Sequence, residues 1–449
     1  MASRLSTEEL AAALGRQLGG TVHGLRRLSG GASRVTSAFD LQTDAGGTRP
    51  LILQMDRGDT GQKGRVRMEA ALLRAAAVAN VPVPAVVALG EGDELGAGWL
   101  VVERLEGETI PRKILRDESW ATARRALTGQ AGSALASIHA IDPASIDGLA
   151  PGDPLGNPLP FLDALDEVRP ALELGVRWLE AHRPANGPRV TVHGDYRFGN
   201  FLVGPDGLRG VLDWELAHTG DPAEDIGWLC APAWRFGGSG VVGGFGAIPA
   251  LLAAYTAAGG EAMTPERVHW WQVYATVKWA TICALQASAH LSGVARSVEL
   301  ATIGRRVCES EWDLFTLLGT SPPTTAGPVA ADGPIAPFGR PTAAELVEAV
   351  REYLDVLMER SDDGDRFEAR VARNALGIAE RELRFGPSLA ASHAERLAGL
   401  GFTDDAALAT ALRSGALDDE WESVAPALAA SARDQLLVAN PAYLPEASR

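Results

Sequence analysis

The sequence predicts an α+β protein that begins with a small antiparallel β-rich part and continues as a mainly helical chain. Three observations predict this. Short apolar, β-branched segments between turn residues fill the first 105 residues, helical periodicity dominates from about residue 118, and a stretch rich in Pro and Gly precedes a last helical region. That stretch, residues 319–341, holds six prolines and four glycines, which is typical of a linker. We therefore expect four parts, with bounds at 1–105, 106–318, 319–341 and 342–449.

The elements of the first part follow from local signals. Ser6-Thr7-Glu8-Glu9 is a capping box, and leucines follow it at helical spacing. A second helix is expected at 65–79 and ends before Val81-Pro82-Val83-Pro84, since neither proline can continue a helix. Around these helices, short strands are predicted at 24–28, 34–41, 50–55, 85–90 and 98–105.

The middle part is predicted to be helical around one island of strands at 190–214, which is apolar, β-branched and interrupted by polar residues. Its expected helices are 118–140, 161–183, 247–258, 265–292 and 296–318. Beyond the linker, Thr342-Ala343-Ala344-Glu345 is a second capping box. It opens a helix in which Leu346, Val350, Tyr353, Leu354 and Leu357 are expected to face a core, and a further helix is expected at 366–384.

Composition excludes several classes of protein. With 46% hydrophobic and 22% charged residues, the 449-residue chain is neither disordered nor fibrous. A net charge of −16 without a Lys/Arg cluster argues against a nucleic-acid partner. The uncharged stretch 236–260 contains eight glycines and a proline, which does not suit a membrane span. Three scattered cysteines and an N-terminus without a signal sequence lead us to expect a cytoplasmic protein with no membrane partner.

The strongest chemical signal is His193-Gly194-Asp195-Tyr196-Arg197-Phe198-Gly199-Asn200, followed shortly by Asp213-Trp214-Glu215. Phosphoryl transfer needs a carboxylate that orients the attacking hydroxyl and oxygen ligands for metal ions that neutralise the phosphates. An Asp and an Asn five residues apart on one loop can face the same phosphate, and a second Asp on the next strand pair can complete the site. Either of the two segments alone also suits an ordinary turn. The two segments in this order favour a site for phosphoryl transfer.

On these motifs the sequence resembles the aminoglycoside phosphotransferases and choline-kinase-like small-molecule kinases over about residues 20–318. The resemblance implies a two-lobed protein-kinase-like fold, followed here by a small all-α domain. It makes Asp195 the catalytic base and Asn200 and Asp213 the ligands of Mg²⁺. It also implies that Asp225 holds the catalytic loop by hydrogen bonds and that Asp221 caps a turn.

A second signal, Ser29-Gly30-Gly31-Ala32-Ser33-Arg34, resembles the loop that covers the nucleotide in these kinases. Small residues let backbone N–H groups approach phosphate oxygens, although a Gly-Gly hairpin turn has the same composition. We expect nucleotide contacts from Ser29, Gly30, Gly31, Ser33 and Arg34. An exposed strand position is the alternative for Arg34.

At one position the sequence departs from the pattern of these kinases. In such kinases a helix glutamate, here Glu69, pairs with a basic residue on the third strand that touches the phosphates. The position of that basic residue is occupied by Gln54. Either Arg34, Lys63 or another basic residue substitutes, or nucleotide binding is weak. The segment around Glu103 and Leu105 resembles the hinge whose backbone contacts adenine.

The expected function is an ATP- and Mg²⁺-dependent phosphotransferase that acts on a hydroxyl of a small molecule. The alternative is a nucleotide-binding, catalytically weak kinase-like module with a helical partner-binding domain, which Gln54 favours. Hydroxylated antibiotics, sugars, amino alcohols and hydroxyacyl metabolites all remain open as acceptors. The acidic region 342–449 is a candidate for self-association or for binding a partner protein. No acceptor residue is assigned from Asp163, Asp166, Glu167, Trp228, Trp234, Trp270 and Trp271.

Overall fold

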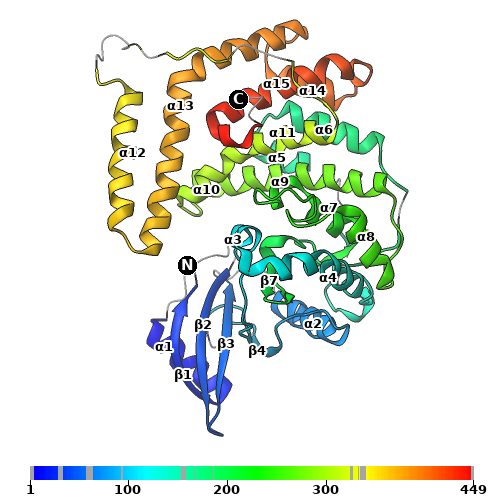
Figure 1. Ribbon diagram of the computed structural model, residues 1–449, viewed down its shortest axis with the longest axis vertical. Coiled ribbons are helices and arrows are strands. Elements are labelled where there is room, and N and C mark those ends of the chain that lie inside the picture. Colours follow the sequence, from blue (N-terminus) through cyan, green and yellow to red (C-terminus); the bar gives the residue numbers. More distant parts are fainter. Residues whose placement is uncertain are drawn as a thin grey trace. The chain divides into compact units, whose positions relative to one another are not determined.

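The protein is described by a computed structural model, which covers residues 5–28, 34–56, 64–92, 95–152, 158–165, 167–185, 187–323, 327–331, 333 and 340–445. It consists of two compact units (Figure 1). Unit 1 comprises Met1–Gly152 and Ala185–Val268, and unit 2 comprises Asp153–Pro184 and His269–Arg449. The expected fold class is confirmed, because an antiparallel sheet comes first, helices dominate the rest, and the C-terminal region is all helical. The bounds at 105, 318 and 341 stay a prediction.

Unit 1 begins with a five-stranded antiparallel sheet of order β1-β2-β3-β5-β4. Leu51 and Leu53 of β3 pack with Leu14 of α1 on one face, while Leu100 and Val102 of β5 join the core on the other face. This alternation follows from the two-residue period of a strand. The elements are α1 (Thr7–Leu18), β1 (Gly20–Arg27), β2 (Arg34–Thr43), β3 (Thr48–Asp56), α2 (Arg65–Val78), β4 (Val86–Gly90) and β5 (Trp99–Glu103).

The rest of unit 1 combines helices with two short antiparallel strand pairs, β6 with β9 and β7 with β8. These pairs confirm the expected strand island. The segment 193–200 lies between β6 and β7, and the segment 212–217 lies between β8 and β9. The elements are α3 (Pro111–Arg116), α4 (Ala121–His139), β6 (Val190–Val192), β7 (Phe201–Gly204), β8 (Gly207–Val211), β9 (His218–Gly220), α7 (Ala223–Cys230) and α8 (Ile248–Ala257).

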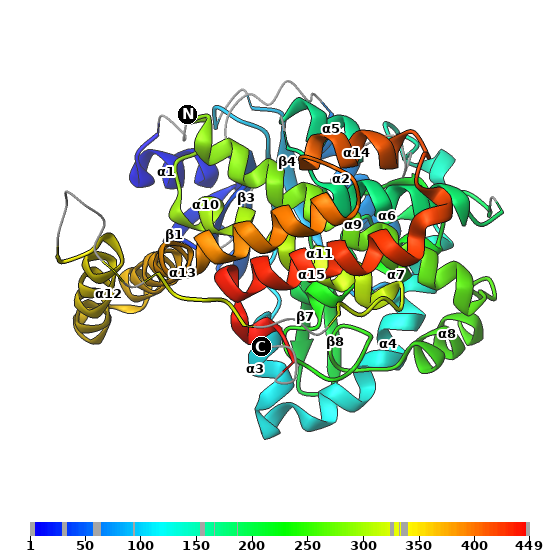
Figure 2. The ribbon, with the colours of Figure 1, turned by 90° about the horizontal axis from the view of Figure 1, so that it is seen from above.

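Unit 2 is helical, and α11, α13 and α15 run side by side in it (Figure 2). A core of leucines and a phenylalanine joins α6 and α11 to the last three helices. The expected single helix at 161–183 is wrong, because α5 ends at Ala164 and α6 starts anew with Pro170 in its first turn. The elements are α5 (Pro158–Ala164), α6 (Pro170–Ala181), α9 (Pro265–Leu291, from His269 on), α10 (Val298–Ile303), α11 (Val307–Leu317), α12 (Ala343–Arg360), α13 (Asp363–Gly399), α14 (Asp405–Arg413) and α15 (Trp421–Ala439).

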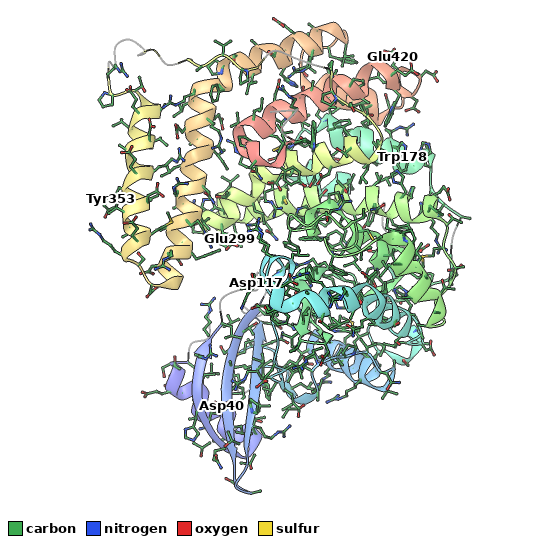
Figure 3. All side chains as sticks on the ribbon, in the orientation of Figure 1. Asp40, Asp117, Trp178, Glu299, Tyr353 and Glu420 are labelled. Atoms are coloured by element: carbon green, nitrogen blue, oxygen red, sulfur yellow. The ribbon has the colours of Figure 1, made fainter. Side chains whose placement is uncertain are left out.

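The expectation that α12 turns its apolar residues to a core is wrong for four of the five residues named, while Leu354 is half-buried. Leu346, Val350, Tyr353 and Leu357 are exposed (Figure 3 labels Tyr353). Ion pairs join α12 to α13, and they are Arg351–Glu380, Glu348–Arg384 and Asp355–Arg373. Helical periodicity therefore identified an amphipathic helix but not the side that packs. Within the described part of the chain, no helix is both long and apolar enough to span a membrane.

Candidate active site

The loop after β6 holds Asp195 by three hydrogen-bond donors. The Asp195 carboxylate accepts from Asn200 Nδ2 at 2.6 Å, from Trp228 Nε1 at 2.7 Å and from Arg197 Nε at 2.9 and 3.1 Å. The carboxylate is nearly buried, so these donors fix its direction. Gly194 precedes it with φ +79°, and a Cβ there would collide with the Leu216 carbonyl. A glycine is thus required before the aspartate.

Asp213 follows β8 and adopts φ +67°, in the left-handed region that few non-glycine residues occupy. The Leu212 N–H donates to the Asn200 carbonyl at 2.9 Å, which ties this loop to the Asp195 loop. Burial, together with the negative charges of Glu215 and Asp195, raises the pKa of Asp213 to about 7. A carboxylate with that pKa lies where a cation would relieve repulsion.

The oxygen donors of Asn200 and Asp213 fit a magnesium ion, which prefers hard oxygen ligands. In the described residues, no group of three or more His, Cys, Asp or Glu side chains is arranged to hold a metal alone. One carboxylate and one amide therefore need further oxygen ligands. Magnesium sites of this kind are completed by substrate phosphates and water.

Arg34 lies beside Glu69, which the resemblance pairs with a basic residue of the third strand. It is the first residue of β2 and lies opposite Asp56 at the end of β3. Its Nε donates to Asp56 Oδ1 at 2.9 Å, and its Nη1 donates to Glu69 Oε2 on α2. Arg34 is 6% exposed and Glu69 is 2% exposed, so the pair is buried. Of the alternatives for the missing charge, the structure brings Arg34 to Glu69, while Lys63 is outside the described residues.

The pKa shifts of Arg34 and Glu69 agree with a buried ion pair between them. Burial raises the pKa of the Glu69 carboxyl, and the positive charge of Arg34 opposes this rise. Burial also acts to lower the pKa of Arg34, but Glu69 and Asp56 outweigh it and the pKa is raised. The Nη2 atom of Arg34 is buried and has no hydrogen-bond partner among the described residues. A buried, unpaired donor of this kind is what an anionic ligand would satisfy.

A chain of ion pairs continues from this pair toward Asp213. Arg65 Nη2 lies 3.0 Å from Asp56 Oδ1 and 3.4 Å from Glu215 Oε2. Glu215 is two residues after Asp213. The sheet, α2 and the Asp213 loop are thereby connected through alternating charges.

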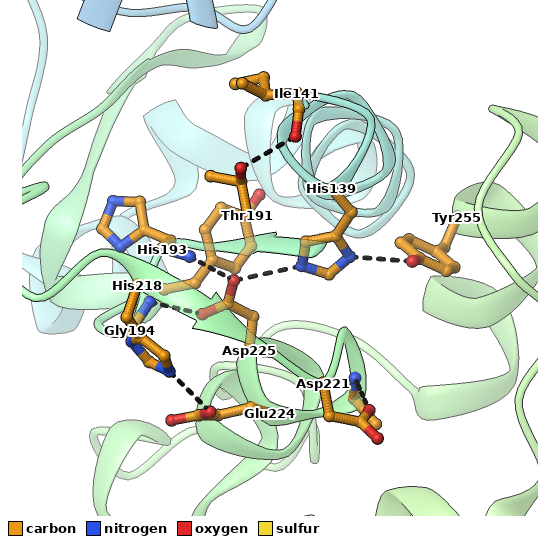
Figure 4. A network of polar contacts seen from close by, with 12 residues as sticks. His139, Ile141, Thr191, His193, Gly194, His218, Asp221, Glu224, Asp225 and Tyr255 are labelled. Atoms are coloured by element: carbon orange, nitrogen blue, oxygen red, sulfur yellow. Dashed lines mark hydrogen bonds and ion pairs between the residues drawn. The ribbon is translucent and has the colours of Figure 1, made fainter. Parts of the chain in front are cut away.

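Asp225 on α7 holds the catalytic loop (Figure 4). It is fully buried, and its carboxylate accepts from the backbone N–H of His193 at 2.8 Å and of Gly194 at 2.9 Å. Its Oδ2 also lies 3.2 Å from His139 Nε2, while His139 Nδ1 lies 2.8 Å from the Tyr255 hydroxyl. Burial opposes ionisation of Asp225, but these hydrogen bonds and the histidine charges lower its pKa. The expected bracing role of Asp225 is confirmed.

The expected turn cap is present as well. Asp221 Oδ1 accepts from the Ala223 N–H at 2.8 Å, and the same carboxylate pairs with Arg267. His193 is fully buried, and burial lowers its pKa. Its Nδ1 accepts from the Asp195 N–H at 3.2 Å, so it braces the loop as expected.

The other predicted positions are only partly located. Ser29, Gly30, Gly31 and Ser33 lie outside the described residues. Gln54 pairs in register with Thr36 of β2 and Leu100 of β5. Glu103 ends β5, where its N–H donates to the Ala85 carbonyl, and Leu105 follows it.

Two residues that contact Asp195 were not predicted as site residues. Arg197 also stacks over the Trp234 ring, with its guanidinium carbon 4.6 Å from the ring centre. Its place two residues after Asp195 was the available signal. Trp228 was considered for the acceptor site but not assigned. Of the other aromatic candidates, Trp270 and Trp271 belong to unit 2.

Comparison with known proteins identifies the family and the fold. The model of the phosphotransferase enzyme family matches residues 24–271. A crystal structure from Ralstonia eutropha, provisionally assigned as an aminoglycoside phosphotransferase, is similar with a TM-score of 0.54 and 22% identity. The match covers 70% of this chain and 99% of that one. This likeness confirms the kinase-like fold. A second model, "Domain of unknown function (DUF6285)", matches residues 359–443.

Curated relatives carry different names. Mouse "Acyl-CoA dehydrogenase family member 10" is 29% identical over 180 residues, which cover 37% of this chain and 16% of that protein. "Probable acyl-CoA dehydrogenase IBR3" of Arabidopsis thaliana is 29% identical over 172 residues, which cover 34% of this chain and 20% of that protein. The chain thus spans a fifth or less of the length of these relatives.

Proposed function

The chain belongs to the phosphotransferase enzyme family, and we propose that it transfers the γ-phosphoryl group of ATP to a hydroxyl of a small molecule. The observation that carries this proposal is the joining of Asp195, Asn200 and Asp213 through the Asn200–Asp195 hydrogen bond and the Asn200–Leu212 backbone bond. The loops that carry the proposed proton acceptor and the two proposed metal ligands are thereby tied together. Phosphoryl transfer needs little else from the protein beyond positioning and charge.

Asp195 is the group that receives the acceptor's hydroxyl. Three donors hold its carboxylate, so the hydroxyl is oriented without a further loss of side-chain freedom. The acceptor oxygen forms a bond to the γ-phosphorus while the bond from that phosphorus to the bridging oxygen of ADP breaks. The hydroxyl proton passes to Asp195 and then to solvent.

The negative charge of the triphosphate would be neutralised by Mg²⁺ and by Arg34. Asn200 and Asp213 are the residues that would hold Mg²⁺, which supplies neutralisation of the phosphate oxygens. On the sheet, Arg34 is held by Glu69 and Asp56, and its buried Nη2, which has no hydrogen-bond partner among the described residues, would be satisfied by a phosphate oxygen. This arrangement supports nucleotide binding despite the neutral Gln54.

The catalytically weak module remains the competing proposal, and Gln54 is the observation that favours it. Asp195→Asn separates the two. An active phosphotransferase loses turnover by about 10²- to 10⁴-fold in this variant, while its affinity for Mg·ATP changes little. Asp206→Asn, an exposed turn residue of unit 1, is the matched control.

The acceptor is found by screening with ATP consumption as the readout. The names of the similar proteins suggest including aminoglycosides and hydroxylated acyl thioesters beside sugars and amino alcohols. If Asp195→Asn kept wild-type turnover of any acceptor found, Asp195 would not be the base. Binding of Mg·ATP with no turnover across the screen would instead favour the catalytically weak module.

A further inference from the structure

Unit 2 contains a cavity that the phosphotransferase chemistry does not use. Its volume is about 620 Å³, within the range typical of small-molecule sites. All of its lining residues belong to unit 2. The wall includes apolar side chains from α9, α10, α13 and α15, which are Ala287, Leu291, Ala301, Leu389, Ala390 and Val438.

The polar part of the wall holds a serine, a histidine and an aspartate in mutual contact. His393 of α13 has its Nδ1 2.9 Å from the Ser431 hydroxyl of α15. The Nε2 of the same ring lies 3.1 Å from both carboxylate oxygens of Asp405, the first residue of α14. Three separate helices therefore bring together a hydroxyl, an imidazole and a carboxylate.

The hydrogen-bond directions follow from the carboxylate. Asp405 accepts, so Nε2 carries the proton and Nδ1 is left as an acceptor for the Ser431 O–H. The Ser431 hydroxyl has a second acceptor in the Ala427 carbonyl, but at 3.3 Å that contact is longer. The imidazole is thus placed to act as the general base for the hydroxyl.

Arg396 adds a positive charge at the same oxygen. It lies one turn after His393 on α13, and its Nε donates to Ser431 Oγ at 3.0 Å. Its Nη2 donates to Asp434 Oδ2 at 2.7 Å, which holds the guanidinium in place. A fixed cation at this position stabilises negative charge that develops on the serine oxygen or on a carbonyl bound to it.

We propose that this cavity is a second catalytic site, in which Ser431 is the nucleophile for hydrolysis of a small carboxylic ester with an apolar acyl group. The apolar wall fits the acyl group, and the order nucleophile, base and orienting acid is the one that acyl transfer requires. Asp405 acts through His393 and is a positioning residue.

The reaction balances with water as co-substrate. Ser431 Oγ bonds to the carbonyl carbon, its proton moves to His393 Nδ1, and that proton leaves with the alcohol as the ester C–O bond breaks. Water then attacks the acyl-serine and gives one proton to His393. The carboxylic acid is released, and the proton returns to Ser431.

The test treats the full chain with a fluorophosphonate probe and locates the adduct by peptide mass spectrometry, beside hydrolysis of p-nitrophenyl butyrate. We expect an adduct on Ser431 and hydrolysis that falls on the order of 100-fold or more in Ser431→Ala and His393→Gln. Asp405→Asn should lower kcat with little change in KM. Ser423→Ala, at an exposed serine of the same helix, is the matched control.

The outcome that overturns the proposal is a folded protein with no Ser431 adduct and with hydrolysis unchanged in Ser431→Ala. The three helices would then share only a structural hydrogen-bond network. Should Ser431→Ala fail to fold, Ser431→Cys replaces it, with iodoacetamide as the probe. We expect alkylation at that cysteine to slow when His393→Gln is added, and equal rates with and without His393 would also overturn the proposal.

Discussion

Replacing Asp213 by Asn should stabilise the metal-free protein while it abolishes binding of Mg·ATP. Burial is the largest cause of the raised Asp213 pKa, followed by the charges of Glu215, Asp195 and Glu69. Without a cation, the ionised carboxylate is therefore a cost to the folded state. Asparagine keeps nearly the same shape and removes the charge.

The magnitude follows from the displaced titration. The pKa of Asp213 moves from an ordinary 3.8 to about 7 on folding. Because the folded pKa is the higher one, this group's contribution to stability is intact below pH 3.8, falls as the pH rises to about 7, and is constant above that. The penalty is roughly 1.5 kcal/mol at pH 5 and on the order of 4 kcal/mol above pH 7. Between pH 5 and pH 8, the stability of Asp213→Asn relative to wild type should therefore grow by the difference between these two penalties.

The assay is urea unfolding in EDTA between pH 5 and pH 8, with wild type, Asp213→Asn and the exposed control Asp206→Asn. The stability difference between Asp213→Asn and wild type should widen with pH, while Asp206→Asn should track wild type. Adding Mg·ATP should then stabilise wild type and Asp206→Asn but not Asp213→Asn. If Asp213→Asn were less stable than wild type at every pH, the ionised Asp213 carboxylate would not destabilise the metal-free protein, and the reasoning would be refuted.

Three further predictions concern other buried groups of unit 1. Arg34→Met leaves Glu69 buried and unpaired, so it should cost about 3–5 kcal/mol of stability in urea unfolding, and adding Glu69→Met should recover part of that loss. Asp225→Asn weakens two backbone hydrogen bonds to the catalytic loop, each worth about 1.5–3 kcal/mol when charged, and steady-state kinetics should show a lower kcat with little change in the KM for ATP. Tyr255→Phe removes the partner of His139 Nδ1 and should cost about 1 kcal/mol in thermal unfolding.

The segment proposed to be catalytic was predictable because its geometry is local. Asp195 and Asn200 share one loop, and the short β7–β8 hairpin brings the Asp213 loop back beside them. Asp225 follows a few residues later, at the first turn of α7. The short separation in sequence therefore made the arrangement predictable, and the structure ties the Asp213 loop to the Asp195 loop. The chemical roles of these residues stay a prediction.

Contacts between residues that are far apart in the chain could not be predicted from the sequence. The pairing of Ser431 with His393 and of His393 with Asp405 depends on how α13, α14 and α15 pack. Trp228 reaches Asp195 across 33 residues, and helical spacing alone does not give its direction. The exposed apolar side of α12 shows the same limit, since periodicity does not state which side meets a neighbour.

The position of Arg34 bears on how the neutral residue at position 54 is interpreted. β2 and β3 are antiparallel neighbours, and their register sets Arg34 opposite Asp56, two residues beyond Gln54. An arginine is long enough to reach Glu69 from there, and its buried Nη2 has no hydrogen-bond partner among the residues that the structure describes. If Arg34 serves the nucleotide, Gln54 does not by itself favour the catalytically weak module, because Arg34 on the neighbouring strand provides a positive charge beside Glu69. Arg34→Gln tests this directly: if ATP affinity in calorimetric titration were unchanged in that variant, the charge at this site would not serve the nucleotide.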